Sequence, residues 1–425
     1  MMNSNSEKKK VLIISYAFPP YPGIGGRRWA KFTKYLVKNG HEVFVICSEN
    51  PFKEKSAWIN DIEQINIQVY PLPLKYPKFI LFGVTSIWDK LIYRMYKLYF
   101  SSYSKGVIFE RTIFWRQQLQ RKASVIIEKE KIKNVIVSIP PYRLASHSIK
   151  LKQKYPDINL ILDYRDPWTD NKSYHGFKGL SAKRLMYERN QENKALAIAD
   201  TVIAVSENMT ENLKKNNNCR KAITIQNGYD PDDIIVDNKA KYSIEGDKLK
   251  FIYAGTVYSN LEYIIEPLLK YFEKLKEKNK PLYDTISFEF YGKQNPEFEK
   301  KIKNFDSDII SLHDYLPLIE IQKKIRESMF CIVMSAPDHS FAFNTKFFEY
   351  IANHKPILLF SYHGDTSKFI LKNNLGFCIN PDNIEKDLDS FFAQLQNTIL
   401  RFNYGFDTEQ YGVPYLTSQV EEILK

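Results

Sequence analysis

The hydrophobic residues of the chain form short runs rich in β-branched side chains, separated by longer stretches in which apolar residues recur every three or four positions. Short runs of this kind indicate buried strands, and the longer stretches indicate amphipathic helices. The expected strands are 11–14, 43–46, 135–139, 160–162, 202–205, 251–253, 287–291, 309–312, 331–334 and 357–360. The expected helices include 30–37, 262–276, 320–327 and 346–353. This alternation predicts an α/β protein made of two doubly wound, Rossmann-like domains.

A polar stretch at 228–248 separates the two halves and shows little apolar periodicity. We therefore expect an amino-terminal Rossmann-like domain over 1–228 and a carboxyl-terminal one over 249–400. A length of 425 residues supplies enough chain for two cores. A cleft between two such domains is the default place for a ligand.

Positive charge is concentrated in one part of the chain. The 61 Lys and Arg against 49 Asp and Glu give a net charge of +12, which favours anionic partners. Residues 75–122 hold ten basic and two acidic residues, so 10 − 2 = +8 of that charge is local, and many aromatic residues lie among them. This composition suits an anionic membrane surface, and a helical hairpin with a solvated basic face explains it equally well. Nucleic acid could use the same chemistry, although we expect none as a partner.

The cysteines and histidines predict no metal site. Cys47, Cys219, Cys331 and Cys378 are far apart and form no CxxC pair, which is typical of a reduced, cytoplasmic protein. The first apolar run is interrupted by prolines and reads as a strand rather than a signal peptide. No run approaches the ~18 apolar residues of a membrane-spanning helix.

A glycine cluster follows the first expected strand. Gly23, Gly25 and Gly26 precede Arg27 and Arg28 at the start of the first helix. Glycines at the carboxyl end of a parallel strand let the backbone approach a bound group, and helix amides with arginines attract anions. Gly25, Gly26 and Arg27 are therefore candidates for a phosphate or acceptor loop, with a tight turn as the structural alternative.

A second polar cluster, from Asp163 to Trp168, follows the strand at 160–162. Arg165 could clamp a phosphate or a sugar hydroxyl, and Asp166 could accept from sugar hydroxyls or act as a base. The structural alternative is an internal Arg/Asp pair that fastens a loop beneath Trp168.

The second half offers a candidate nucleotide site. Gly255 and Thr256 end its first strand, where we expect the Gly255 N–H to be available to a phosphate. Lys346 and Glu349 lie three residues apart at the start of a helix capped by Asn344 or Thr345. Such a helix start could present the lysine to a diphosphate and the glutamate to a ribose diol. An ordinary surface ion pair is the alternative.

Taken in order, these segments resemble the GT-B glycosyltransferases, in particular family four. The matching stretches are Phe18-Pro19-Pro20 with Gly25-Gly26-Arg27, Gly40-His41-Glu42-Val43, Asp163 to Trp168, Gln226-Asn227-Gly228-Tyr229-Asp230, Tyr253-Ala254-Gly255 and the sequence TKFFEYIANHKP from Thr345 to Pro356. The sequence departs from the family pattern in three respects. Phe341 stands where a glutamate is usual, and Thr256-Val257-Tyr258 follow Gly255 in place of an Arg and a Lys. The histidine often found in the amino-terminal domain of the family is not evident.

The resemblance implies a nucleoside diphosphate sugar donor, UDP-sugar favoured over GDP-sugar, bound by the carboxyl-terminal domain, with Glu349 on the ribose. Asn227, Gly255, Thr256 and Lys346 join it as donor-binding candidates. Lys346 is also a catalytic candidate with Arg165 and Asp166. The acceptor, a glycan or lipid-linked precursor of a cell-envelope polysaccharide, would bind the amino-terminal domain. Residues 401–425 resemble the helix that crosses back to that domain. Transfer with retention and no metal or other cofactor is implied. The cysteines add the expectation of a cytoplasmic protein, and residues 75–122 add that of a peripheral membrane contact.

Two other functions fit the same residues. A nucleotide-sugar epimerase or hydrolase would keep the fold and change only the product. A non-enzymatic membrane or nucleic-acid binding protein would explain these departures as lost activity.

Overall fold

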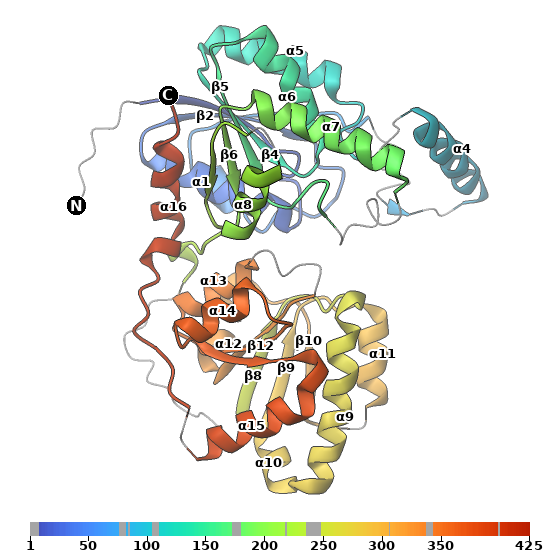
Figure 1. Ribbon diagram of the computed structural model, residues 1–425, viewed down its shortest axis with the longest axis vertical. Helices are drawn as coiled ribbons and strands as arrows, with labels where there is room; N and C mark the ends of the chain where they lie inside the picture. Colours follow the sequence, from blue (N-terminus) through green and yellow to red (C-terminus); the bar gives the residue numbers. More distant parts are fainter. Residues whose placement is uncertain are drawn as a thin grey trace. The chain divides into compact units, whose positions relative to one another are not determined.

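The structure is a computed structural model that describes residues 8–75, 82–83, 86–103, 110–171, 180–216, 219–234, 248–305, 307–336, 343–397 and 400–425. The chain divides into two compact units (Figure 1). Unit 1 comprises residues 1–226 and 413–425, and unit 2 comprises residues 227–412. The division falls where the polar stretch begins, and the last residues of the chain belong to the first unit.

Unit 1 is built on a seven-stranded parallel sheet with the order β3-β2-β1-β4-β5-β6-β7. Its strands are β1 Lys10–Ile14, β2 Glu42–Ser48, β3 Gln68–Leu72, β4 Asn134–Ile139, β5 Asn159–Tyr164, β6 Thr201–Ala204 and β7 Ala222–Thr224. Its helices are η1 Ile24–Gly26, α1 Arg27–Lys38, α2 Asn60–Glu63, α4 Ile87–Tyr103, α5 Arg116–Glu130, α6 Arg143–Lys154, α7 Ala182–Ile198, α8 Glu207–Asn216 and α16 Val413–Glu421. The order of the strands reverses between β1 and β4, the switch point where doubly wound sheets bind ligands.

The carboxyl-terminal helix α16 completes one face of this sheet. Leu416 and Val420 share an apolar cluster with Trp29 and Leu36 of α1 and with the strand residues facing them. At the amino ends of the strands, the Asn159 side-chain amide donates to the Ile423 carbonyl (2.7 Å). The last turn of the chain is therefore part of the folded core of unit 1.

Unit 2 contains a six-stranded parallel sheet with the order β10-β9-β8-β11-β12-β13. Its strands are β8 Leu249–Ala254, β9 Ile286–Tyr291, β10 Ile310–His313, β11 Phe330–Met334, β12 Ile357–Phe360 and β13 Gly376–Ile379. Its helices are η2 Pro231–Asp233, η3 Ser259–Leu261, α9 Glu262–Lys278, α10 Lys280–Thr285, α11 Pro296–Asn304, α12 Leu318–Glu327, α13 Thr345–Ala352, α14 Asp365–Lys372, η5 Pro381–Asn383, α15 Ile384–Gln396 and η6 Glu409–Tyr411.

Two apolar clusters cover the faces of the second sheet. One packs α9, α10, α11 and α15 around Phe251, which stacks on Phe288 and Phe330 at centroid distances of 4.7 and 5.3 Å. The other packs α12, α13 and α14 on the opposite face, around Phe347 and Tyr350. The switch point of this sheet lies between β8 and β11, and α13 follows β11 in the chain.

The predicted α/β architecture is confirmed, and every strand expected from the apolar runs is present. Three strands that we did not expect, β3, β7 and β13, are edge strands that are short or interrupted by a polar residue or Pro71. Among the described residues, every helix is too short or too polar to cross a lipid bilayer.

Candidate functional site

In unit 2, the loop after β8 is fastened from several sides. The Gly255 N–H donates to the Tyr291 carbonyl (2.9 Å), so the expectation that this amide is available to a phosphate is wrong. The Gln294 side chain accepts from the Val257 N–H (2.8 Å) and donates to the Gly255 carbonyl (2.9 Å). These bonds hold the backbone of the loop in place, and Gly255 and Thr256 are both partly exposed. A fixed loop at a strand end is suited to binding a ligand.

Helix α13 is tied to the strand that leads into this loop. The Asn344 side chain caps the helix by accepting from the Phe347 N–H (2.8 Å), so Asn344 is the capping residue. The Tyr350 hydroxyl, in the second half of the helix, accepts from the Ala254 N–H (3.1 Å) at the carboxyl end of β8. The helix is therefore fixed to the residue that precedes Gly255.

Lys346 and Glu349 form an ion pair at 2.8 Å on this helix. The two side chains differ in exposure, because Glu349 is 2% exposed and Lys346 is 32% exposed. An ordinary surface pair has both groups in solvent and stabilises little. Here a buried carboxylate positions an accessible ammonium at the carboxyl edge of the sheet, which is an arrangement that can receive an anion.

A groove of about 490 Å³ lies at the β9 and β10 end of the same edge. Tyr291 and His313 stack there with ring centroids 4.4 Å apart. Asp314, Lys323 and further residues of α12 complete its lining. The size and the aromatic floor of the groove fit a small planar ligand.

The segment entering unit 2 is anchored to the same apolar cluster as α13. Tyr229 packs in that cluster and its N–H donates to the Tyr411 carbonyl (3.0 Å). Asn227 lies two residues before it, at the start of the unit. The donor-binding candidates Asn227, Gly255, Thr256, Lys346 and Glu349 thus belong to one unit, and all but Asn227 lie at the carboxyl edge of its sheet.

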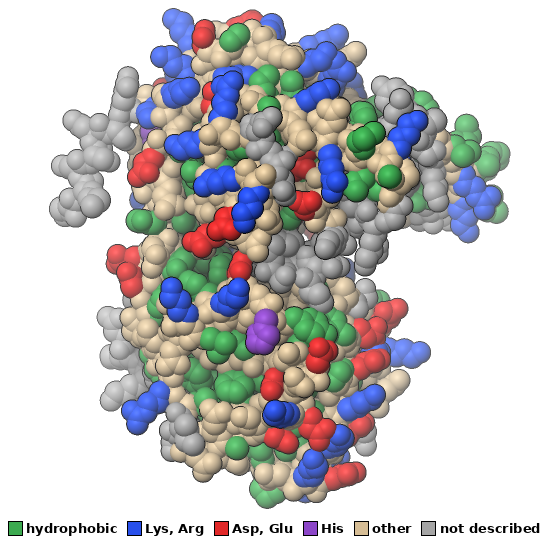
Figure 2. Space-filling model, viewed as in Figure 1, with side chains coloured by type: hydrophobic (Ala, Val, Ile, Leu, Met, Phe, Trp, Pro, Cys, Tyr) green, Lys and Arg blue, Asp and Glu red, His purple; other side chains and the backbone are tan. Residues whose placement is uncertain are grey.

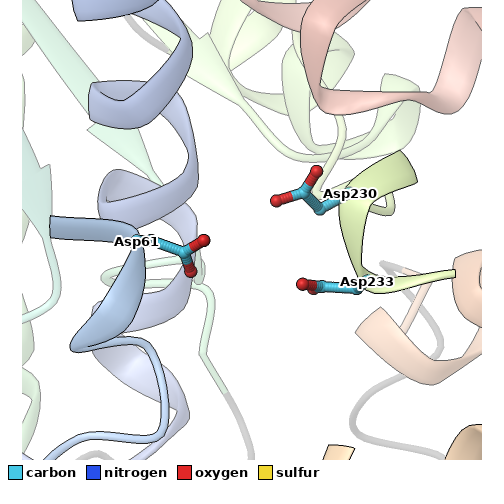
Figure 3. A group of neighbouring side chains, drawn as sticks. All are labelled: Asp61, Asp230 and Asp233. Carbon is cyan, nitrogen blue, oxygen red and sulfur yellow. The ribbon is translucent and has the colours of Figure 1, made fainter. Parts of the chain in front are cut away.

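The carboxylates that follow this segment serve local structure. Asp230 caps η2 by accepting from the Asp232 N–H (3.0 Å), and Asp233 lies on the same turn (Figure 3). Asp61, also drawn in Figure 3, belongs to unit 1, where it pairs with Lys31 (2.8 Å) and Lys34 (3.3 Å). We assign none of the three as a metal ligand.

In unit 1, the carboxyl edge is dominated by a buried network around Asp163. This carboxylate accepts from Arg28 (2.9 Å from Nη2) and from the Trp29 indole N–H (2.7 Å). Arg28 also donates to the carbonyls of Ile225 (2.9 Å) and Gln226 (2.7 Å). Asp163 is fully buried, so the Arg28–Asp163 pair joins α1, β5 and the segment Ile225-Gln226 inside the core.

Arg165 fastens the glycine loop. Its Nη1 donates to the Gly25 carbonyl (2.6 Å) and its Nη2 to the Pro140 carbonyl (2.6 Å). A Cβ on Gly25 would come within 3.3 Å of this guanidinium, which would have to shift by a few tenths of an ångström. Both Nη groups bind backbone, which favours the structural interpretation of Arg165 over a phosphate clamp.

Gly26 and Arg27, the other two candidates of the glycine loop, are less exposed than Asp166. Gly26 is buried, and Arg27 is 1% exposed with its guanidinium over the Trp58 ring (5.5 Å). Neither therefore presents an open surface to a ligand in this conformation. Asp166 follows Arg165 directly and is partly exposed.

A second buried cluster lies behind these loops. Arg143 pairs with Glu188, which also accepts from the Trp168 indole (3.0 Å), and Trp168 stacks on Tyr142. Burial raises the pKa of Glu192, which accepts from Thr169, to about 7. Burial lowers the pKa of His147, whose ring bonds the Thr112 carbonyl (2.8 Å), to about 4. The end of the 163–168 loop, at Trp168, is thus bound to α7, a contact that the sequence did not indicate.

Aromatic rings continue from this edge toward α4. Tyr16 contacts Trp115 (5.2 Å between centroids) and Tyr21 (5.4 Å), and Tyr21 contacts Phe52 (5.6 Å). Phe52 in turn contacts Phe82 (5.3 Å). These residues are scattered in sequence and come together only in the fold.

No protein-family model and no curated protein sequence matches the chain. Several solved structures, in contrast, match the fold of the chain over nearly its full length. Sucrose-phosphate synthase from Thermosynechococcus elongatus is 12% identical over 98% of both chains, with a TM-score of 0.67. Anabaena HepE, solved in complex with UDP-glucose, is 12% identical over 97% of this chain and 98% of its own, with a TM-score of 0.63. A putative UDP-N-acetylglucosamine 2-epimerase from Listeria monocytogenes is 13% identical over 97% and 95%, with a TM-score of 0.54.

These similarities identify the fold. Two Rossmann-like domains with parallel sheets of seven and six strands constitute the GT-B fold, over nearly the full length of both chains. At 12–13% identity the likeness reaches no further than the fold.

Proposed function

We propose that the chain is a glycosyltransferase that moves a sugar from a nucleoside diphosphate sugar, a UDP-sugar rather than a GDP-sugar, to a glycan or lipid-linked precursor, with retention of configuration. The observation that carries this proposal is the Lys346–Glu349 pair at the start of α13, with its carboxylate buried and its ammonium accessible. The presence of UDP-glucose in the HepE structure supports the choice of donor.

The donor is held by unit 2. Glu349 accepts hydrogen bonds from the ribose hydroxyls, and Lys346 neutralises the diphosphate as it leaves. Thr256, on the fastened loop after β8, offers a hydroxyl to the phosphates. The groove lined by Tyr291 and His313 receives the planar base. Asn227, at the entry to the unit, completes the donor-binding set.

The acceptor is held by unit 1. Arg165 acts as a positioning residue, since it fixes the Gly25 and Pro140 backbones that bound the acceptor side. Asp166, next to it and partly exposed, orients an acceptor hydroxyl. The glycine loop with Gly26 and Arg27 shapes this side of the site.

Calorimetric titration of UDP and GDP into the wild type, Glu349→Gln and Asp284→Asn tests the donor assignment. Asp284 is the matched control, because it forms an i,i+4 pair with Lys280 (2.8 Å) on α10 of the same unit and does not line the groove. We expect UDP to bind, and to bind about tenfold or more weakly in Glu349→Gln, since a hydrogen bond to a charged group is lost. Asp284→Asn should match the wild type. Absence of binding by either nucleotide, or equal losses in both variants, would overturn the assignment.

Product analysis separates transfer from epimerisation. Incubation of the protein with a UDP-sugar that it binds and with glycan acceptors should release UDP and yield a lengthened acceptor. A changed UDP-sugar formed without any acceptor would instead identify an epimerase of the same fold.

A further inference from the structure

Helix α4 exposes an apolar surface. It starts at a reciprocal cap in which the Ser86 N–H donates to Asp89 (3.0 Å) and the Asp89 N–H donates to Ser86 (3.0 Å). Seven of its large apolar side chains are exposed in solvent: Ile87, Trp88, Leu91, Ile92, Met95, Leu98 and Tyr99. Elsewhere in the described part of the chain, exposed apolar side chains such as Val125, Met186 and Leu371 are more scattered. Figure 2 shows the hydrophobic and basic atoms of this region together.

The exposed side chains of α4 share one side of the helix. At about 100° per residue, the seven fall within an arc of about 140°. Lys90 and Arg94, both exposed, lie beside one edge of this arc, near Ile87. An apolar arc with a basic edge is the pattern of a helix that lies in the plane of a membrane interface.

We propose that α4 seats the protein on the anionic surface of a lipid bilayer. The apolar arc, which we define as these seven side chains, enters the boundary between headgroups and acyl chains. Lys90 and Arg94, which we call the basic edge, contact the anionic headgroups. Trp88 is suited to the interface because its ring is apolar and its indole N–H can stay in contact with polar groups.

The charges favour a bilayer over a second copy of the chain. Two copies of α4 packed about a two-fold axis would bring their basic edges near each other, in a chain that already carries +12. An anionic bilayer removes that repulsion and buries the same apolar area. The proposal does not depend on the glycosyltransferase assignment, although the aromatic contacts from Tyr21 to Phe82 would give a lipid-linked acceptor an apolar path toward the strand ends.

Sedimentation of the full chain with vesicles tests the proposal. The vesicles contain phosphatidylcholine with or without phosphatidylglycerol. We expect the wild type to bind the phosphatidylglycerol vesicles, and Ile87→Ser/Leu91→Ser/Met95→Ser to lose tenfold or more in affinity. The matched control is Val125→Ser/Met186→Ser/Tyr415→Ser, which removes three exposed apolar side chains from other helices of unit 1 and should bind like the wild type.

The charge component has its own variant pair. Lys90→Gln/Arg94→Gln should bind phosphatidylglycerol vesicles about tenfold or more weakly, and its binding should depend less on salt. Lys183→Gln/Arg189→Gln, on exposed positions of α7, removes the same net charge and should leave binding unchanged. Equal losses in both variants would show that only the overall charge matters and would contradict the proposal.

Trp88 reports the location of the contact. It is 73% exposed, whereas Trp29, Trp115 and Trp168 are buried, so vesicles should shift its emission to shorter wavelength. Trp88→Phe should keep vesicle binding and lose most of that shift.

The proposal is overturned if the wild type fails to bind the vesicles, if its emission is unchanged on binding, or if RNA competes fully for the site. It is also overturned if α4 variants only dissociate a dimer. Nucleotide titration measures binding to unit 2, whereas vesicle binding measures the surface of α4 in unit 1. Failure of the membrane proposal therefore leaves the glycosyltransferase proposal testable, and the reverse also holds.

Discussion

The carboxyl edges of the two sheets use charge in opposite ways. In unit 1, Asp163 and Arg28 are buried together, and Arg165 binds two backbone carbonyls. In unit 2, the Lys346–Glu349 pair keeps its ammonium accessible. The same topology therefore supports buried ion pairing in one unit and a partly exposed ammonium in the other. Motif composition alone would rank the charged stretch of unit 1 as the richer site, whereas exposure favours unit 2.

This contrast separates the effects of substitutions. Changes at the unit 1 network should act on folding, and changes at the unit 2 pair should act on nucleotide binding. The sequence supplies a selective probe, because all five tryptophans, Trp29, Trp58, Trp88, Trp115 and Trp168, lie in unit 1. Tryptophan fluorescence therefore follows the unfolding of unit 1 alone, and UDP titration follows unit 2.

The largest effect is expected for Asp163→Asn. Loss of the carboxylate leaves the buried Arg28 guanidinium without its counter-charge, and breaking a buried pair in this way costs about 3–5 kcal/mol. Urea unfolding followed by tryptophan fluorescence measures the loss. Asp157→Asn, an exposed carboxylate of the same unit, should stay within about 0.5 kcal/mol of the wild type. A wild-type midpoint for Asp163→Asn would mean that the network does not hold unit 1 together.

A second expected effect is on the pH dependence of unit 1. Because burial raises the pKa of Glu192 from 4.5 to about 7, the folded state keeps a proton that the unfolded chain releases between these values. Below pH 4.5, Glu192 contributes its full stabilisation, which adds up to about 3 kcal/mol to the free energy of unfolding. This contribution is lost as the pH rises to 7. Relative to Glu192→Gln, the wild type should therefore lose stability from pH 4.5 to 7.

His147 contributes with the opposite sign. Burial lowers its pKa from 6.5 to about 4, so the unfolded chain takes up a proton that the folded ring does not. Stability from this group is lost as pH falls from 6.5 to 4. The wild type should thus show a flatter pH profile than Glu192→Gln or His147→Gln, each measured by urea unfolding across the range. Parallel profiles for all three proteins would contradict both assignments.

The fold was accessible to sequence analysis because buried parallel strands are continuous apolar runs. Central strands such as 11–14 and 331–334 stand out for this reason. The edge strands β3, β7 and β13 were missed, because a strand with one neighbour needs less apolar sequence. The helix cap at Asn344 and the i,i+3 pairing of Lys346 with Glu349 followed from local patterns.

The partners of the site residues were not accessible, because they come from distant parts of the chain. Gly255 donates to Tyr291 only because β8 and β9 are neighbours, and Arg165 reaches Gly25 across 140 positions. The sequence contained both members of each pair without any signal that joined them. Sequence patterns therefore located charged residues at strand ends, while the choice between fastening and binding needed their exposure and contacts.

An intermediate effect is expected for Arg165→Ala. Two backbone carbonyls lose their donors, which should lower the stability of unit 1 by about 1–3 kcal/mol. If the proposed acceptor side depends on these loops, sugar transfer should fall while UDP affinity stays at the wild-type value. Arg165→Lys can restore one of the two bonds and should recover part of the stability. Weaker UDP binding in Arg165→Ala would place this residue on the donor side instead.

The last substitution, Lys346→Gln, sharpens the contrast between the two edges most directly. Lys346 is partly exposed but its partner Glu349 is buried, so the substitution takes the counter-charge from a buried carboxylate and should lower the stability of unit 2 by about 1–3 kcal/mol, measured by unfolding followed by circular dichroism. UDP affinity should also fall about tenfold, because the ammonium faces the proposed diphosphate. Lys280→Gln removes the lysine of the exposed Lys280–Asp284 pair, which lies outside the groove, and should leave both quantities unchanged. If the two lysine variants behaved alike, the unit 2 pair would be an ordinary surface contact, and its accessible ammonium would have no part in binding.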